Sequence, residues 1–159
     1  MKRVARRTLS VAVVATVSVA GCAELQPETG ERLAACSDAD SDPTRTVSFK
    51  DQIRPLLDNE VPGTKGCVTC HYPEGTTREG IEAVRLTLMP LGELRKGGAS
   101  SAGRIVIPGK PCDSALVQKL RGTFPNGARM PKGGPFWEPA QIQLVIDWIA
   151  EGANGEDAD

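Results

Sequence analysis

The sequence predicts an all-α domain made of several short helices and long loops. The clearest evidence lies near the C-terminus, where apolar side chains recur at i, i+3, i+4 and i+7 between Ile142 and Ile149. Runs with strand periodicity are scarce, and the 17 glycines and 12 prolines among 159 residues indicate irregular connections. The core is poor in aromatic residues, with two Trp, one Tyr and three Phe, so it would gain from a bulky apolar group supplied from outside.

Two of the expected helices lie in the first two thirds of the chain. The first begins at Thr46 or Ser48 and runs to Leu57, with Pro55 weakening its end. The second is the short segment Pro90–Lys96, where proline suits the first turn and two glycines follow the last.

Two more helices are expected closer to the C-terminus. One begins at Asp113 or Ser114 and ends at Gly122, and the last covers residues 139–152 with proline at its start and glycine at its end. Residues 105–107 are apolar and β-branched, but this run is too short and isolated to define a sheet.

The first 21 residues are expected to be a signal peptide. Four basic residues lie within Met1–Arg7, and the mostly apolar stretch Leu9–Ala20 is too short to span a membrane. The run Val19-Ala20-Gly21-Cys22 resembles a bacterial lipobox, in which the cysteine is lipidated and becomes the new N-terminus. An ordinary secretory signal with an unrelated cysteine is the alternative. Either route predicts export, and the lipobox predicts an envelope lipoprotein on the periplasmic side of the inner or outer membrane.

The remaining chain divides into three parts. Residues 22–45 are rich in polar and acidic side chains without periodicity, which predicts a disordered acidic tether. Residues 46–153 form the expected domain, and residues 154–159 an acidic, frayed tail. Beyond the signal peptide, 15 basic residues stand against 20 acidic ones, so a nucleic-acid partner is not expected.

The motif that carries chemistry is C-x-x-C-H at Cys67–His71, the pattern of covalent c-type haem attachment. Two thiols at this spacing can add to the two vinyl groups of one haem, and the adjacent imidazole then lies under the iron. His71 is the one histidine of the chain. The predicted cofactor is therefore one haem c, covalently bound through Cys67 and Cys70.

Three alternative roles for this motif are weaker. A thioredoxin-like site would need a βαβ context, which the sequence lacks. A zinc site would need Cys36 and Cys112, and the adjacent Cys70 and His71 cannot easily bind one ion in good geometry. A disulfide between Cys67 and Cys70 would close a loop too small to stabilise much.

The sixth iron ligand is expected to be a methionine, because no second histidine exists and a thioether is the usual strong-field alternative. Met1 leaves with the signal peptide, so Met89 and Met130 remain. Met89 lies in an apolar stretch typical of core packing, whereas Met130 lies in a Gly/Pro loop that could bring its sulfur to the iron. We favour Met130.

With these motifs in place, residues 46–153 resemble the small single-haem c-type cytochromes, including those carried on bacterial lipoproteins. The segments that carry the resemblance are the helix before the haem motif, the motif itself, and three further runs: Val106–Gly109, Arg129–Pro131 and Trp148–Ala153. The resemblance implies a cytochrome c-like fold wrapped around one haem, with its first and last helices in contact. It also implies Cys67 and Cys70 as thioether anchors, with His71 and Met130 as axial ligands. The stretch from residue 73 to 101, which lacks a long helix, departs from the pattern.

Two of the five cysteines belong neither to the lipobox nor to the C-x-x-C-H motif. Cys36 and Cys112 form an even pair in an oxidising compartment, so we expect a disulfide between them. Free thiols or pairing with another subunit are the alternatives. For the wall of the haem pocket, the candidates are apolar side chains spread over the domain: Leu86, Leu88, Leu94, Ile105, Val106, Ile107, Leu116, Ile142 and Trp148. For any single one of them, ordinary core packing is the alternative that we favour.

These features predict a membrane-tethered electron carrier rather than an enzyme. An iron with both axial positions filled has no open site for a substrate. The acidic chain would favour redox partner proteins with a basic docking surface. A haem-based ligand sensor or weak peroxidase is the alternative if the distal site is open, and a non-redox envelope lipoprotein is a third possibility.

Overall fold

The computed structural model describes residues 33–59, 61–62, 65–77 and 79–156. The expected signal peptide, the lipidation site Cys22 and the first part of the expected tether lie outside these residues. Within the described ranges every regular element is a helix, which confirms the all-α prediction, and the apolar run at residues 105–107 forms no strand. No helix in this part of the chain is long and apolar enough to cross a membrane.

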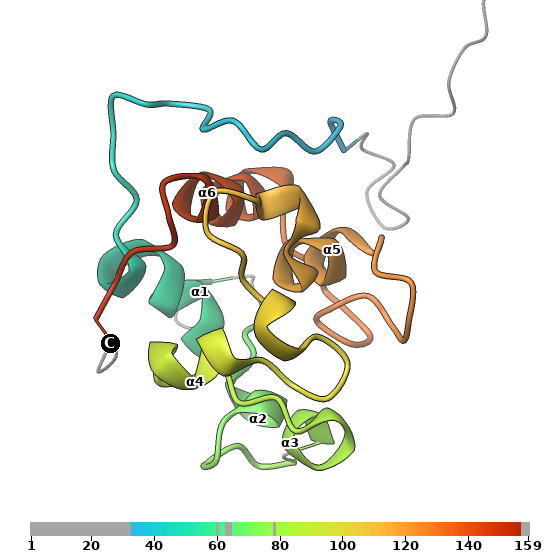
Figure 1. The fold of residues 1–159 in the computed structure, drawn as a ribbon. Helices are drawn as coiled ribbons and strands as arrows, with labels where there is room; N and C mark the ends of the chain where they lie inside the picture. The colour runs from blue at the N-terminus through green and yellow to red at the C-terminus, as the bar shows by residue number, and fades with distance from the viewer. Residues whose placement is uncertain (1–32, 60, 63–64, 78, 157–159) are drawn as a thin grey trace, which may run out of the picture.

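The elements are short and follow one another around the domain (Figure 1). In chain order they are η1 (Phe49–Ile53), α1 (Arg54–Asp58), α2 (Val68–His71), α3 (Glu79–Val84), α4 (Leu91–Lys96), η2 (Ala102–Arg104), η3 (Pro111–Asp113), α5 (Ala115–Arg121) and α6 (Pro139–Ala150). The first expected helix is thus two pieces, since η1 is a π-helical turn that leads directly into α1. Pro55 lies in the first turn of α1, where its missing N–H costs nothing, so it starts this helix rather than weakening its end.

Helix α6 is the centre of the core. Its predicted stripe is buried, and Trp148 on the same helix is completely enclosed. The start of α6 is fixed by Gln141, whose side-chain oxygen accepts a hydrogen bond from the Glu138 backbone N–H at 2.9 Å. Gly152 follows its end at a φ of 105°, a conformation that favours glycine. The Phe49 ring of η1 packs against Trp148 with 5.2 Å between centroids, so the first and last helical segments are in contact as expected.

The second half of the expected tether lies along the domain. Residues 33–45, named here the strap, run across the top of the molecule in Figure 1 over α6 and α5. Leu33 is buried, and Ser41 donates two hydrogen bonds to Asp147 of α6, from its backbone N–H at 2.9 Å and its hydroxyl at 2.7 Å. The strap therefore differs from the solvated linker that its composition predicts, because specific polar contacts and one buried leucine hold it in place.

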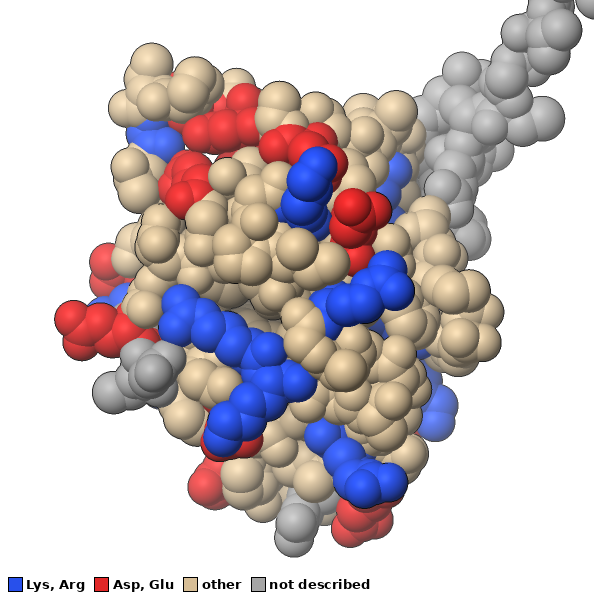
Figure 2. Space-filling view, in the orientation of Figure 1, with Lys and Arg blue, Asp and Glu red and all other residues tan. Residues whose placement is uncertain are grey.

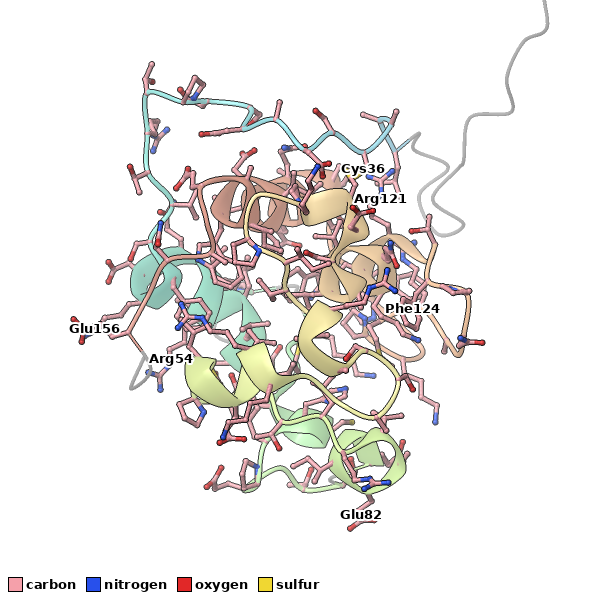
Figure 3. All side chains as sticks on the ribbon, in the orientation of Figure 1. Cys36, Arg54, Glu82, Arg121, Phe124 and Glu156 are labelled. Carbon is pink, nitrogen blue, oxygen red and sulfur yellow. A yellow bond between two sulfur atoms is a disulfide. The ribbon has the colours of Figure 1, made fainter. Side chains whose placement is uncertain are left out.

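A disulfide joins the strap to the domain. Cys36 is bonded to Cys112 of η3, with 5.7 Å between their Cα atoms, which is the pairing expected from the cysteine count. Two polar contacts flank it: the Cys112 backbone N–H donates to Asp38 at 2.9 Å, and Arg121 donates to the Ala34 carbonyl at 2.8 Å. Figure 3 shows Cys36 and Arg121 at the same edge of the domain.

The beginning of the expected tail is also held by the domain. The indole N–H of Trp148 donates to the Asn154 carbonyl at 2.8 Å, and Arg95 donates to the Ala153 carbonyl at 3.0 Å. Residues 153–155 thus cover one end of the core, so the chain is still fixed at residue 154, where the sequence predicts fraying.

Candidate functional site

The C-x-x-C-H motif at Cys67–His71 forms one turn of helix, α2, which begins directly after Cys67. The backbone N–H groups of Cys70 and His71 both donate to the Cys67 carbonyl, at 3.2 and 2.9 Å. This turn brings the two thiols and the imidazole to the wall of a single cavity. The turn is tied to α1 by a 2.7 Å hydrogen bond from the Cys67 N–H to the Leu57 carbonyl.

The cavity has a volume of about 320 Å³ and a mostly apolar lining. That volume lies within the usual range of small-molecule sites, near its lower end. Its walls come from α2, α3, α5, the segment 98–105 and the loop 124–132. Met130 lies in this last loop and lines the same cavity as Cys67, Cys70 and His71. All four residues predicted to bind the cofactor therefore meet at one place.

The two candidate methionines are separated by their surroundings. Met89 is buried in the hydrophobic core and is not part of the cavity lining. Met130 is half-buried, and its backbone N–H is fixed by a 2.9 Å hydrogen bond to the Lys119 carbonyl of α5. Of the two methionines, the one that lines the cavity is Met130.

The nine candidates for the pocket wall divide into two groups. Leu86, Leu88, Ile105 and Leu116 do line the cavity. The other five candidates are not part of its lining, and all of them except the half-buried Ile107 belong to the buried core: Leu94, Val106, Ile107, Ile142 and Trp148. Helical periodicity predicts that a side chain is buried, but it does not predict whether that side chain lines the cavity.

The environment of His71 fixes the role of each ring nitrogen. The side chain is buried, and Nδ1 lies 3.1 Å from the Leu86 carbonyl oxygen. Because a carbonyl can only accept, Nδ1 carries the proton and donates, which leaves Nε2 with a free lone pair. Burial lowers the pKa of the imidazole, and the Leu86 hydrogen bond partly opposes this effect. At neutral pH His71 is therefore a neutral base that can bind a metal through Nε2.

The thiols of the motif are free, whereas the other two described cysteines are bonded to each other. Burial raises the pKa of the Cys67 thiol to about 12, and the neighbouring Cys70 and Asp58 add to the effect. Because Cys36 and Cys112 form the disulfide, they cannot complete a zinc site. The part of the chain that the structure describes contains no group of three or more His, Cys, Asp or Glu that could hold a metal ion.

A polar cluster beside the motif holds it to α1. The Tyr72 hydroxyl donates to Asp58, and Asp58 also pairs with Arg54 at 3.1 Å. Burial and the Asp58 contact raise the pKa of the Tyr72 phenol. Tyr72, the residue after His71, is therefore buried and fixed to Asp58 of α1.

Several lining residues were not identified from the sequence. Three lysines reach the cavity from different segments, Lys65, Lys119 and Lys132, together with Glu79 of α3. Gly80 of α3 lies directly against the His71 ring. Nothing in the local sequence marks these residues, because they come together only through the path of the chain.

Searches against protein-family models, curated proteins and solved structures found no match for this chain.

Proposed function

We propose that this protein is a membrane-tethered electron carrier, a single-haem c-type cytochrome. The observation that carries the proposal is that Cys67, Cys70, His71 and Met130 line one apolar cavity, although Met130 lies far from the motif in the sequence. Haem bound there supplies a one-electron couple between ferric and ferrous iron.

The residues of the cavity fit this group. Two free thiols at the required spacing are available for thioether bonds. The His71 ring presents an unprotonated Nε2, because Nδ1 donates to the Leu86 carbonyl. The thioether of Met130 would provide a soft second ligand, which would favour the reduced state relative to a second histidine.

The cavity supports electron transfer rather than turnover of a substrate. If His71 and Met130 both held the iron, no coordination position would be left for an exogenous molecule. The apolar walls, among them Leu86, Leu88 and Leu116, would limit the access of water to the iron and the solvent reorganisation that accompanies a change of its charge. These residues thus favour cycling between ferric and ferrous iron without turnover of a substrate at the metal.

The proposed carrier needs redox partner proteins, and the surface offers two kinds of charge to them. The acidic strap, with Asp38, Asp40 and Asp42, crosses the top of the view in Figure 2, while cationic side chains lie over the middle and lower part of that face. A partner with a basic docking surface fits the strap. A partner that docks at the cavity itself meets lysines there, so salt dependence of the rate is expected in either case.

Anchoring at the membrane completes the proposal. A lipid on Cys22 would hold the domain close to the bilayer, with the strap starting eleven residues later at Leu33. The lipobox at residues 19–22 supports this anchor.

The test is an optical spectrum of the full, haem-matured chain in its ferric and reduced states, with Met130→Leu and Met89→Leu as a matched pair. Both substitutions remove a sulfur and keep the side-chain volume. We expect covalent haem and a low-spin spectrum in the wild type, and loss of the thioether-to-iron charge-transfer band in Met130→Leu only.

Two results would overturn the proposal. Absence of covalent haem would refute the cofactor itself. A high-spin ferric spectrum unaffected by Met130→Leu would mean an open iron and would favour a ligand sensor or peroxidase instead.

A further inference from the structure

The imidazole of His71 has unusually close contact with the backbone of α3. A Cβ atom built at Gly80 would stand 2.2 Å from both Cε1 and Nδ1 of His71 and 2.7 Å from Nε2. Real contacts of a Cβ atom essentially never fall below 3.0 Å. Any residue other than glycine at position 80 would therefore displace either the ring or the helix.

Conformation does not explain this glycine. The backbone at Gly80 is outside the left-handed region, so other residues could adopt it. Within a helix, glycine costs about 1 kcal/mol relative to alanine. The feature that requires glycine at this position is the space occupied by the His71 ring.

The ring cannot easily move away from α3. Its Nδ1 is held by the Leu86 carbonyl at 3.1 Å, and the His71 carbonyl accepts from the Leu88 N–H at 3.1 Å. The Leu86 N–H in turn approaches the Gly80 carbonyl at 3.4 Å. His71, Gly80 and Leu86 thus form a closed set of contacts around the imidazole.

Helix α3 is also held at its C-terminal end. A Cβ at Gly98 would stand 2.6 Å from the Val84 carbonyl oxygen, and the Ala99 N–H donates to that same oxygen at 2.7 Å. Helix α3 is therefore in contact with His71 near its start, at Gly80, and with the segment that begins at Gly98 at its end, at Val84. A methyl group at position 80 would therefore have to move either a ring held by the Leu86 carbonyl or a helix held at Val84.

We infer that Gly80 is a positioning residue for His71: by leaving no Cβ, it lets α3 close on the imidazole and fixes the ring so that Nδ1 donates to Leu86 and Nε2 remains free for a metal. This inference rests on the proposed haem site. The hydrogen bond at Nδ1 increases the basicity of the ligand, which stabilises ferric iron. A methyl group at position 80 disturbs that bond and raises the reduction potential.

The first experiment compares Gly80→Ala with Gly103→Ala in the full, haem-matured protein. Gly103 is a matched control, since it also lies in a helical turn outside the left-handed region, and a Cβ there meets nothing within 4 Å. The readouts are the reduction potential and the electron paramagnetic resonance spectrum of the ferric state. We expect a higher potential and altered g-values in Gly80→Ala and wild-type values in Gly103→Ala. Equal values in both variants would refute the inference.

A second experiment does not depend on haem and covers the case in which Gly80→Ala matures poorly. The free energy of unfolding of the haem-free chain is measured for Gly80→Ala, His71→Ala and the double variant. If the ring is what Gly80 accommodates, Gly80→Ala destabilises the wild-type background and is neutral or slightly stabilising once His71→Ala has removed the ring. The same loss on both backgrounds would overturn the inference.

The two experiments separate this inference from the proposed function. Absence of haem in the wild type would refute the proposed function, and the haem-free cycle would still decide whether Gly80 positions His71.

Discussion

The rings of Phe49 and Trp148 lie in contact at the centre of the fold, with their centroids 5.2 Å apart and their planes inclined by 38°. The two residues are almost a hundred positions apart in the sequence, and both are buried. Their contact joins the first helical segment to the last and so closes the domain that contains the cavity.

We expect Trp148→Ala to lower the free energy of unfolding by about 3–5 kcal/mol, because the indole is fully enclosed and its removal leaves a cavity. Chemical denaturation measures the loss. A double-mutant cycle with Phe49→Leu isolates the ring pair, for which a coupling of about 0.5–1.5 kcal/mol is expected. A loss within experimental error for Trp148→Ala would show that the two segments do not pack as described.

The disulfide is expected to contribute strongly to stability. It links residues 76 positions apart, for which the chain-entropy estimate is about 4.5 kcal/mol, an upper value in practice. The double variant Cys36→Ser/Cys112→Ser should therefore unfold at clearly lower denaturant concentration than the wild type, measured without reductant. Retention of wild-type stability, or mass spectrometry showing two free thiols in the wild type, would argue against the bond.

The strap should detach when its contact with α6 is removed. Asp147 accepts from the Ser41 N–H and hydroxyl and from the Gln143 amide, so Asp147→Ala leaves these donors without their acceptor. We expect a loss of about 1–3 kcal/mol and faster proteolysis within residues 33–45. Asp113→Ala, at an exposed aspartate, is the control and should change neither. Equal cleavage rates in the two variants would contradict the prediction.

The haem-free protein should lose stability at alkaline pH. Burial raises the pKa of Cys67 to about 12 from 9.0 and also raises that of Tyr72. The unfolded chain releases these protons at lower pH than the folded chain does. Above about pH 9 the folded state therefore binds more protons, and the free energy of unfolding falls as the pH rises.

Thermal unfolding between about pH 8 and about pH 10 measures this effect. The decrease in Tm over that range should be smaller in Cys67→Ala/Tyr72→Phe than in the wild type. A decrease of the same size in both proteins would mean that other groups cause it.

The sequence by itself determined the features that are encoded within a few neighbouring residues. The period of the Ile142–Ile149 stripe predicted α6, and the spacing of Cys67, Cys70 and His71 predicted that two thiols and an imidazole would share one wall of a site. The pairing of the two remaining cysteines followed from their number and the expected compartment. Such patterns can be identified because hydrogen bonding and side-chain geometry within one turn are local.

The tertiary structure decided what depends on the path of the chain. It placed Met130 in the cavity and Met89 in the core, and it brought the Gly80 backbone against the His71 ring. It also laid the strap on α6, where Ser41 binds a carboxylate 106 residues away. Composition predicted a solvated tether there, since acidic and polar residues bury little apolar surface. Contacts over such separations depend on which surfaces the folded chain brings together, and no local period or spacing encodes that.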